Sequence, residues 1–279
     1  MTPAVAASIA AQLGVPLGGI TPAGNGFTRN WRARAGDEPV FIKLAADTDR
    51  LAAEADGLVA LADCRELVIP RVLARGEAAG ASFLVMTWLP LAGGGDPARL
   101  GAAIAALHAI HGPSYGWRRD NYLGATPQAN GQENDWASFF AHRRLAPQLS
   151  MAAGRGFAAV AGPGRHLLAA LPDLMAGHQP PAALLHGDLW HGNTGSVGGR
   201  PAVFDPAVHY GDPECDLAMA ALFGGFAPAF FATHATVHPP LPGWQRRRRL
   251  YQLYHLLNHL NLFGSGYLGS VLEILEELT

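Results

Sequence analysis

The segment "LLHGDLWHGNTG", residues 184–195, restricts the fold more than any other part of the sequence. Two histidines, an aspartate, a tryptophan and an asparagine stand between glycines, directly after an apolar run. A second segment, "VFDPA", places Asp205 at the end of the next strand-like run. Side chains that follow two neighbouring strands converge at the strand ends. The sequence has an aspartate after one strand, an asparagine five residues later and a second aspartate after the next strand. The spacing therefore predicts one polar site that contains Asp188, Asn193 and Asp205.

The residue types at this site favour phosphoryl transfer over a zinc centre. His186 and His191 could bind zinc, but the segment has no thiolates and lacks the helical spacing of metalloprotease histidines. Asn193 and Asp205 instead offer the hard oxygen ligands that Mg²⁺ prefers. Asp188 is then the group that takes the proton of an acceptor hydroxyl. We expect His186 to brace the loop through a hydrogen bond, as a buried histidine usually must.

Three features nearer the N-terminus predict an ATP site. Lys43 lies in the apolar strand "VFIKL", where its ammonium needs an anion unless the side chain extends from an edge strand into water. Glu54, about one helix later, can orient Lys43 toward phosphates, or can be a solvated helix residue. The loop "AGNGFTRN" contains Gly24, Asn25 and Gly26, which let backbone N–H groups approach phosphates, although a hairpin turn explains them equally well.

The order of elements predicts an α+β protein of two lobes. Strand-like runs, a hairpin around Gly36 and a helix over 47–63 fill the first third, before Pro90 and the Gly-rich "LAGGGDP" break the pattern. We expect a small antiparallel β-sheet lobe with one helix over 1–88, which binds nucleotide. A hinge around 86–91 leads to a larger, mainly helical lobe over 89–279, which holds the catalytic and acceptor groups. The sequence predicts strands at 27–36, 38–45, 68–77 and 81–90, β segments within 183–197 and 201–219, and helices at 97–111, 134–149, 165–175, 244–263 and 266–278.

Composition excludes several classes of protein. The chain has 279 residues, 49% hydrophobic and 15% charged, with a net charge of -2, so it is globular and has no basic field for nucleic acid or an anionic membrane. The basic run at 246–249 is expected to be a solvated helix end rather than a phosphate patch. The N-terminal segment reads as a short helix rather than a signal peptide, and no run is long enough to span a membrane. Cys64 and Cys215 lack metal-ligand spacing, so we expect reduced thiols in a cytoplasmic protein. We also expect a monomer, although the sequence leaves an oligomer open.

These motifs together resemble the kinase-like phosphotransferase superfamily, which includes aminoglycoside phosphotransferases and choline kinases. The resemblance narrows to the fructosamine kinase (ketosamine-3-kinase) family over about residues 20–265. It is carried by "HGDLWHGN", "FDPAVHYGDPECDLAM", "ALFGGF", "DNYLGATPQANGQENDWASFFAHRRLAPQL" and "LYQLYHLLNHLNLFG". The family implies a bilobal protein kinase-like fold, ATP and Mg²⁺. It also implies phosphorylation of the O3 hydroxyl of a ketosamine, a fructosamine or ribulosamine adduct that then becomes unstable, so that the amine is deglycated.

The resemblance assigns roles to residues of this chain. Asp188 resembles the catalytic base, Asn193 and Asp205 resemble the Mg²⁺ ligands, and Lys43 and Glu54 resemble the pair that positions phosphates. The loop at 23–30 departs from the family pattern Gly-Gly-Gly-(Ser/Cys)-Ile-Asn-Glu, because Asn25 replaces a glycine and Thr28 stands where the pattern has asparagine.

Further residues are assigned to the nucleotide hinge and to the acceptor. Met86 and Trp88 lie in the segment that, in such kinases, pairs with adenine. Trp190, two residues after the base, is placed to stack on the sugar or its amine-bearing tail, or else packs within the loop. Asp120 and Asn121 could bind the polar acceptor or shape a loop. Asp212 and Asp216 are expected to hold the loop of Asp188 through backbone hydrogen bonds.

Two alternatives compete with a ketosamine kinase. An aminoglycoside or other hydroxyl phosphotransferase would need an acidic cleft for a polycation, which the segment with Arg143 and Arg144 does not supply. A pseudokinase that only binds ligands would be expected to lack a catalytic group. Because the five groups assigned to base, metal and phosphates are all present, the sequence favours an active enzyme.

Overall fold

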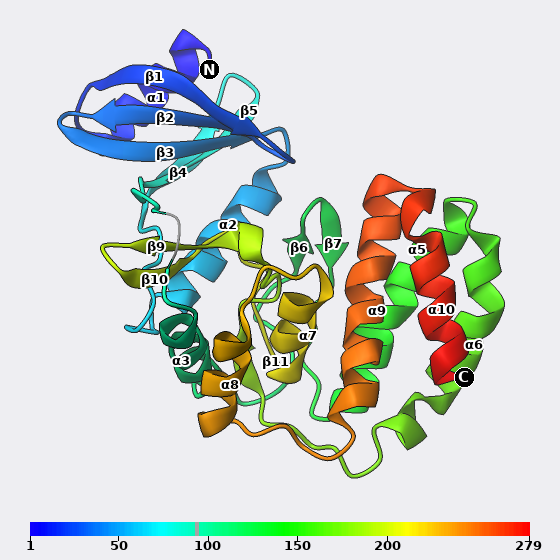
Figure 1. Cartoon of the computed structure of the whole chain (residues 1–279). Coiled ribbons are helices and arrows are strands. Elements are labelled where there is room, and N and C mark those ends of the chain that lie inside the picture. Colours follow the sequence, from blue (N-terminus) through cyan, green and yellow to red (C-terminus); the bar gives the residue numbers. More distant parts are fainter. Residues whose placement is uncertain (93–94) are drawn as a thin grey trace. The chain divides into compact units, whose positions relative to one another are not determined.

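The computed structural model describes residues 1–92 and 95–279, which form two compact units (Figure 1). The first unit comprises Met1–Gly95 together with Thr194–Pro206, and the second comprises Asp96–Asn193 and Ala207–Thr279. The sequence predicted contiguous lobes at 1–88 and 89–279, whereas the first unit also takes in a segment from far along the chain. Residues 93–94 of the predicted Gly-rich break lie outside the described residues.

The first unit is built on a five-stranded antiparallel sheet of order β1-β2-β3-β5-β4. Ala35 pairs with Glu38 across the expected hairpin, so the turn falls at Gly36-Asp37. Side chains alternate between the two faces of a strand, which places Lys43 on the opposite face from Ile42. The strands are β1 (Leu17–Asn25), β2 (Arg29–Ala35), β3 (Glu38–Ala45), β4 (Val72–Ala78) and β5 (Ala81–Thr87).

Two helices cover the faces of this sheet. Val5 and Ile9 of α1 (Pro3–Leu13) are buried in one core with Ile42 of β3. Leu51 of α2 (Thr48–Leu61) is buried in a second core with Met86 of β5. The expected single helix is α2, and α1 is the short helix indicated by the N-terminal segment. Lys43 thus lies on the α2 side of the sheet.

A hairpin from late in the sequence completes the first unit. It consists of β9 (Thr194–Val197) and β10 (Arg200–Val203). The N–H of Val68 donates to the Pro201 carbonyl at 2.8 Å, and the N–H of Val203 donates to the Val68 carbonyl at 3.2 Å. The N–H of Ala92 donates to the Ser196 carbonyl at 2.9 Å. These bonds explain why 194–206 belongs with the sheet.

The second unit is mainly helical, as expected. Its core surrounds α9, where Leu253 and Leu257 are fully buried beside Trp136 and Phe140. The helices are α3 (Pro97–His108), α4 (Trp136–Phe139), α5 (Ala146–Gly154), α6 (Ala161–Leu174), α7 (Glu214–Leu222), α8 (Pro228–Val237), α9 (Trp244–Phe263) and α10 (Leu268–Leu278). Short elements are β6 (Asn121–Leu123), β7 (Thr126–Gln128), β8 (Ala183–Leu185), β11 (His209–Gly211), η1 (Phe140–Leu145), η2 (Ala158–Val160), η3 (His191–Asn193) and η4 (Ser265–Tyr267).

The basic run at the start of α9 is only partly solvated: Arg246 is exposed, but two of its other arginines are paired with carboxylates. Arg247 is buried and its guanidinium bonds both carboxylate oxygens of Glu214, at 2.7 Å each. Arg249 pairs with Glu273 at 2.8 Å and Glu277 at 2.7 Å. The prediction was wrong for Arg247, because α9 packs against other helices there and a buried arginine needs a carboxylate partner.

Cys64 and Cys215 are both buried, and they form no disulfide with each other. Within 1–92 and 95–279, no helix combines the length and apolar character needed to cross a bilayer.

Candidate active site

Lys43 is held between two carboxylates in the first unit. Its Nζ lies 2.7 Å from Glu54 Oε1 and 2.6 Å from Asp205 Oδ1. Burial opposes a charged ammonium, but the two carboxylates outweigh it and raise the pKa of Lys43 above its ordinary value. Lys43 is therefore a fixed cation on the α2 side of the sheet, as the apolar strand around it predicted. The expected contact between Lys43 and Glu54 is confirmed.

Asp205 follows β10 in an uncommon conformation. Its φ is 56°, in the left-handed region that few residues other than glycine adopt, and aspartate is one of those that tolerate it. The side chain is 47% exposed although its Oδ1 contacts Lys43. Because the Asp205 carboxylate is exposed, it can leave Lys43 for another cation without becoming an unpaired charge in the core.

The predicted phosphate loop is the turn between β1 and β2. Asn25 pairs with Arg29, and the N–H of Gly26 donates to the Thr28 carbonyl at 3.2 Å. Arg50 of α2 donates to the Phe27 carbonyl at 3.2 Å. The loop at Gly24 and Gly26 is thus a hairpin tip tethered to α2, and the side chain of Asn25 lies outside the described part of the structure.

Of the two residues expected in the nucleotide hinge, Met86 is buried in a core and Trp88 packs against two side chains of the sheet. Met86 is 3% exposed and packs in the core beneath α2, so its side chain does not reach a surface. The Trp88 ring lies 6.0 Å from Phe41 and 4.6 Å from the Arg32 guanidinium. The Trp88 N–H donates to the Pro39 carbonyl at 3.2 Å, so this N–H already has an acceptor within the unit.

Asp216 of α7 anchors the start of the loop at 186–193 in the second unit. The N–H groups of His186 and Gly187 donate to its two carboxylate oxygens at 2.8 and 2.9 Å. Burial works against ionisation, but the hydrogen bonds that Asp216 accepts from His108 and from the His186 N–H lower its pKa below the ordinary value. The expected backbone hydrogen bonds of Asp216 are confirmed.

Asp188 and Asn193 face each other within this loop. Asn193 donates from Nδ2 to Asp188 Oδ2 at 3.1 Å and to the Asp188 carbonyl at 3.0 Å. The N–H of Asp188 donates to Nδ1 of fully buried His186 at 3.3 Å, which is the bracing role expected of that histidine. Because Nδ2 of Asn193 points to Asp188, the amide oxygen is the atom of Asn193 that can bind a cation.

Trp190 projects from the same loop with a defined orientation. A Cβ on Gly192 would lie 2.2 Å from the Trp190 ring, so the glycine lets the indole lie against the backbone. His191 meets Trp190 edge-on, with ring centroids 5.1 Å apart. His186 and His191 belong to no cluster of three or more potential metal ligands among the described residues.

Asp120 and Asn121 belong to the scaffold around β6 and β7. Asn121 is 4% exposed, donates to the Val208 carbonyl at 2.8 Å, and accepts from Gln128 and Asn130. Asp120 is exposed and accepts from the Asn130 N–H at 2.8 Å. The structure favours the loop-shaping alternative for Asn121, because a side chain so buried and so fully bonded presents no group to an acceptor.

The sequence reasoning missed the polar network that supports these two residues. Arg144 is 1% exposed and donates to Asn130 Oδ1 at 2.7 Å and to the Ala129 carbonyl at 2.6 Å. Tyr254 of α9 donates to Gln128 Oε1 at 2.6 Å. A signal existed in Arg144, a charged residue inside an amphipathic helix, but its partners come from elsewhere in the chain.

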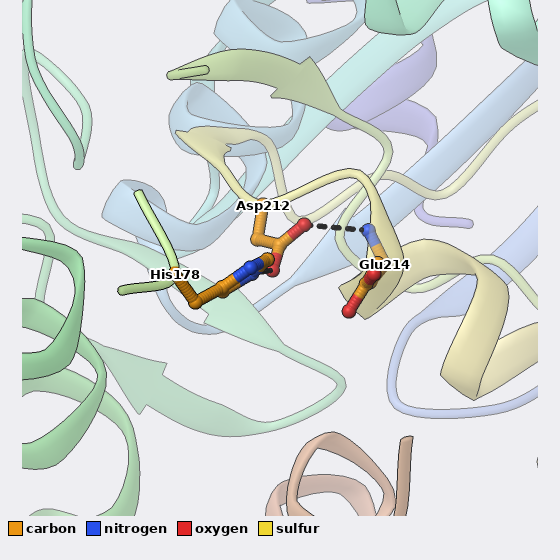
Figure 2. Close-up of side chains that lie close together, drawn as sticks. All are labelled: His178, Asp212 and Glu214. Carbon is orange, nitrogen blue, oxygen red and sulfur yellow. Dashed lines mark hydrogen bonds and ion pairs between the residues drawn. The ribbon is translucent and has the colours of Figure 1, made fainter. Parts of the chain in front are cut away.

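Asp212 does not hold the loop at 186–193. It accepts from His178 Nε2 and from Tyr251 Oη, each at 2.6 Å, and from the Glu214 N–H at 2.9 Å. Figure 2 shows His178 and Glu214 on either side of Asp212. These three side chains could hold a metal ion by proximity, but Arg247 already occupies both oxygens of Glu214. The group is therefore a hydrogen-bonded network, and the expected role of Asp212 is wrong.

The donor chemistry of the site residues can be stated from these contacts. Asp205 offers an exposed carboxylate and Asn193 an amide oxygen, both of which suit a hard divalent cation. Lys43 offers a fixed positive charge that suits phosphate oxygens. Asp188 offers a carboxylate that is half-buried and oriented by Asn193. Each of these groups is of a type that phosphoryl transfer uses, Lys43 and Asp205 in the first unit and Asp188 and Asn193 in the second.

Comparison with known proteins identifies the family. The fructosamine kinase family model matches residues 1–279. A "Probable ketoamine kinase" of Synechocystis is 42% identical over 251 residues, covering 87% of this chain and 83% of the relative. A chloroplastic protein-ribulosamine 3-kinase of Oryza sativa subsp. japonica is 38% identical over 230 residues, covering 80% of this chain and 67% of the relative.

Solved structures agree with this result. A protein described as a fructosamine-3-kinase from Haemophilus somnus has a TM-score of 0.91 at 28% identity, over 99% of this chain and 96% of that one. An aminoglycoside phosphotransferase in complex with ADP and hygromycin B has a TM-score of 0.65 at 15% identity over 98% of both chains, which shows the fold alone. The expected kinase-like α+β fold is confirmed. With a family model that matches every residue and relatives above 30% identity, the chain belongs to the fructosamine kinase family.

Proposed function

We propose that this chain transfers the γ-phosphoryl group of ATP to the O3 hydroxyl of a ketosamine, with Asp188 as the base. As a member of its family the chain is an ATP-dependent kinase; the residue roles, the use of Mg²⁺ and the acceptor hydroxyl are the proposal. The observation that carries it is the Lys43 ammonium, 2.7 Å from Glu54 and 2.6 Å from Asp205. A buried lysine held in this way is ready to meet the phosphates of a nucleotide.

In the proposed reaction, Asp188 accepts the proton of the acceptor hydroxyl while the oxygen bonds to the γ-phosphorus and the bond to ADP breaks. Asn193 keeps the Asp188 carboxylate oriented through its Nδ2. Asp216 keeps the backbone of the loop in place through the N–H groups of His186 and Gly187. A base held by neighbours loses little orientational freedom in the transition state, which favours the reaction.

Asn193 and Asp205 would hold Mg²⁺ through their oxygens. Held there, the cation would supply positive charge that offsets the negative charge developing during transfer. The hairpin supports this pairing of ligands, because Thr194 pairs with Val203 and the chain therefore enters and leaves the hairpin at one end. Asp205 would then exchange Lys43 for the cation, and Lys43 would turn to the phosphates.

The acceptor is proposed to be a fructosamine or ribulosamine adduct, free or carried by a protein. Trp190 supports this class, because a half-buried indole beside the base can stack on a sugar or on an amine-bearing tail. The cytoplasmic location and the monomeric state expected from the sequence stay predictions.

The test is ATP consumption across a panel of fructosamines, ribulosamines, erythrulosamines and aminoglycosides, with Asp188→Asn as the blank. We expect turnover on at least one ketosamine, and a fall of about a thousandfold or more in the variant with ATP binding retained, because a lost base harms chemistry more than ground-state binding. Phosphorylation at O3 is read from the product. Undiminished turnover in Asp188→Asn, or turnover on aminoglycosides alone, would contradict the proposal.

A further inference from the structure

A cavity of about 270 Å³ lies within the second unit, between α7, the C-terminal half of α8 and the chain that leads into α9. The proposed reaction does not use it. A cavity of about 150 Å³ already holds a benzene molecule, so this one has room for an aromatic ring with a short substituent. Its apolar lining includes Pro213, Leu217, Phe231, Val237, Pro240 and Trp244.

One polar side chain in the cavity wall has an unused hydrogen-bonding atom. His234 of α8 is 1% exposed, and its Nδ1 has no hydrogen-bond partner in the described part of the chain. Its other nitrogen, Nε2, lies 2.9 Å from Nδ1 of His108. Burial lowers the pKa of His234 to about 3, so the imidazole is neutral at neutral pH. A buried nitrogen without a partner costs stability unless something else completes it.

The hydrogen-bond network assigns the direction of this chain of histidines. Asp216 is ionised and only accepts, so His108 donates to it from Nε2, over 3.2 Å. A neutral His108 that donates from Nε2 accepts at Nδ1, which leaves the neutral His234 to donate from Nε2. The remaining Nδ1 of His234 then carries a lone pair, and the ligand that completes it must be a donor.

The same chain of contacts reaches the proposed base. Oδ2 of Asp216 accepts hydrogen bonds from His108 Nε2 and from the His186 N–H, and Oδ1 accepts one from the Gly187 N–H. These residues begin the loop that carries Asp188. A donor that polarises His234 and His108 therefore acts on the carboxylate that holds this loop.

The charges around the cavity favour a cation over an anion. Among the described residues, the titratable side chains that line it are those of Asp212, Glu214, His234 and His238, and none is a lysine or an arginine. Figure 2 shows these two carboxylates together, and each is satisfied by a neighbour, His178 or Arg247. The α8 helix ends at Val237, so its C-terminus, which carries the negative end of the helix dipole, also faces this wall. Aromatic rings of Phe231 and Trp244 offer faces that attract cations.

We propose that this cavity binds a small organic ammonium ion with an apolar body, whose N–H donates to His234, and that the bound ion acts on the loop of Asp188 through His108 and Asp216. The first part is independent of the catalysed reaction. The second part rests on the proposed function only where turnover is the readout.

The binding test uses the whole chain and two probes with the same ring, benzylammonium and benzoate. Calorimetry is expected to give a dissociation constant of about 1 mM for benzylammonium, since a ligand of this size gains about 4 kcal/mol, and at least about tenfold weaker binding of benzoate. Ala235→Leu fills the cavity and is expected to weaken benzylammonium binding by about tenfold or more. Ala232→Leu, on the exposed face of the same helix, is the matched control. Equal binding of the two probes, or unchanged binding to Ala235→Leu, would overturn the site.

The coupling is tested by two readouts. Benzylammonium is expected to shift the amide resonances of His186 and Gly187 in the wild-type chain and in Ala232→Leu, but not in Ala235→Leu. In the phosphorylation assay it is expected to change kcat by about twofold or more while both KM values stay constant. Binding without either change would overturn the action on the loop. A rise in the acceptor KM that persists in Ala235→Leu would place the ion at the acceptor site and overturn the proposal. If no acceptor is turned over, the proposed function fails, but the amide shifts still decide this proposal.

Discussion

Asp205 combines a left-handed backbone with a charged side chain that contacts Lys43. A residue other than glycine at a φ of 56° costs stability, which a fold retains where the side chain must be aimed. Its exposed carboxylate lies 2.6 Å from a buried ammonium, so it stabilises Lys43 in the absence of nucleotide and is accessible to solvent on its other side. The conformation and the charge therefore serve separate purposes, and they can be separated by mutation.

Asp205→Asn should keep the conformation and remove the charge, because asparagine also tolerates the left-handed region. We expect Mg²⁺-dependent nucleotide binding to weaken by about tenfold or more and turnover to fall by about a hundredfold, since a neutral amide binds a divalent cation poorly. Nucleotide binding measured across a Mg²⁺ titration checks this. Asp37→Asn, which removes an exposed charge in the same unit, is the control. An unchanged titration would remove Asp205 from the metal site.

Trp190→Ala should raise the acceptor KM by about tenfold and leave the ATP KM nearly constant. The loss of a ring that stacks on a sugar or a cation costs about 1–2 kcal/mol. Trp190→Phe keeps an aromatic face and should restore much of the affinity. Steady-state kinetics with each substrate varied in turn separates the two constants. A change confined to ATP would place the ring elsewhere.

At the residue scale, sequence reasoning succeeded where a residue type is unusual in its setting. Lys43 inside an apolar strand needs an anion, and Glu54 is the expected partner at 2.7 Å. The sequence did not predict the hydrogen-bond partners of Asn121, because Gln128, Asn130 and Val208 come from different parts of the chain. A polar side chain does not reveal in sequence whether its partners are solvent, ligand or buried backbone.

At the scale of elements, the loop at 186–193 depends on one glycine. Gly187 has a φ of 80°, and a Cβ there would lie 2.0 Å from the Ala207 carbonyl oxygen. The close approach lets the N–H of Ala207 donate to the His186 carbonyl at 2.9 Å. A side chain at this position would push the loop away from β11 and α7, which would displace Asp188.

Gly187→Ala should therefore destabilise the chain by about 2 kcal/mol or more beyond Gly198→Ala. Gly198, in the β9–β10 turn, has a φ of 56° but nothing within 4 Å of a Cβ, so it carries only the cost of the left-handed region, about 1–2 kcal/mol. Urea unfolding of the two variants compares their free energies. Turnover should fall strongly in Gly187→Ala alone. Equal stabilities would mean that the loop can move without cost.

Elements with a clear period were predictable, and others were not. The helix expected at 244–263 matches α9, because its apolar residues and terminal glycines, Gly243 and Gly264, mark both ends. The helix expected at 134–149 is instead α4, the π-helical η1 and α5, a change of hydrogen-bond pattern that has no periodic signal. The α8 helix was missed because threonine, histidine and phenylalanine have low helix propensity. Packing against α3 stabilises it instead.

At the scale of the whole chain, the two units are interleaved in sequence. The hairpin of β9 and β10 belongs to the first unit, yet it follows the loop of Asp188, which belongs to the second. The sequence could place Lys43 and Asp205 in one site by resemblance, but it assigned Asp205 to the second lobe. No local pattern indicates that Val68 and Ala92 are the backbone partners of a hairpin more than a hundred residues away.

The interleaving predicts that the first unit needs 194–206 to be stable. A fragment of residues 1–95 loses the hydrogen bonds of Val68 with Pro201 and Val203, the bond of Ala92 with Ser196, and the contact of Lys43 with Asp205. Each backbone bond contributes about 1 kcal/mol, and in a domain of this size 1 kcal/mol shifts Tm by about 4–8 °C. Joining 194–206 to the fragment through a flexible Gly/Ser linker should therefore raise Tm by about 10 °C or more, as followed by circular dichroism.

The same linker with a scrambled 194–206 is the control, and it should leave Tm near that of 1–95. If the scrambled and native segments stabilise the fragment equally, the hairpin is not part of the unit's folding core, and the support of Lys43 must come from Glu54 alone.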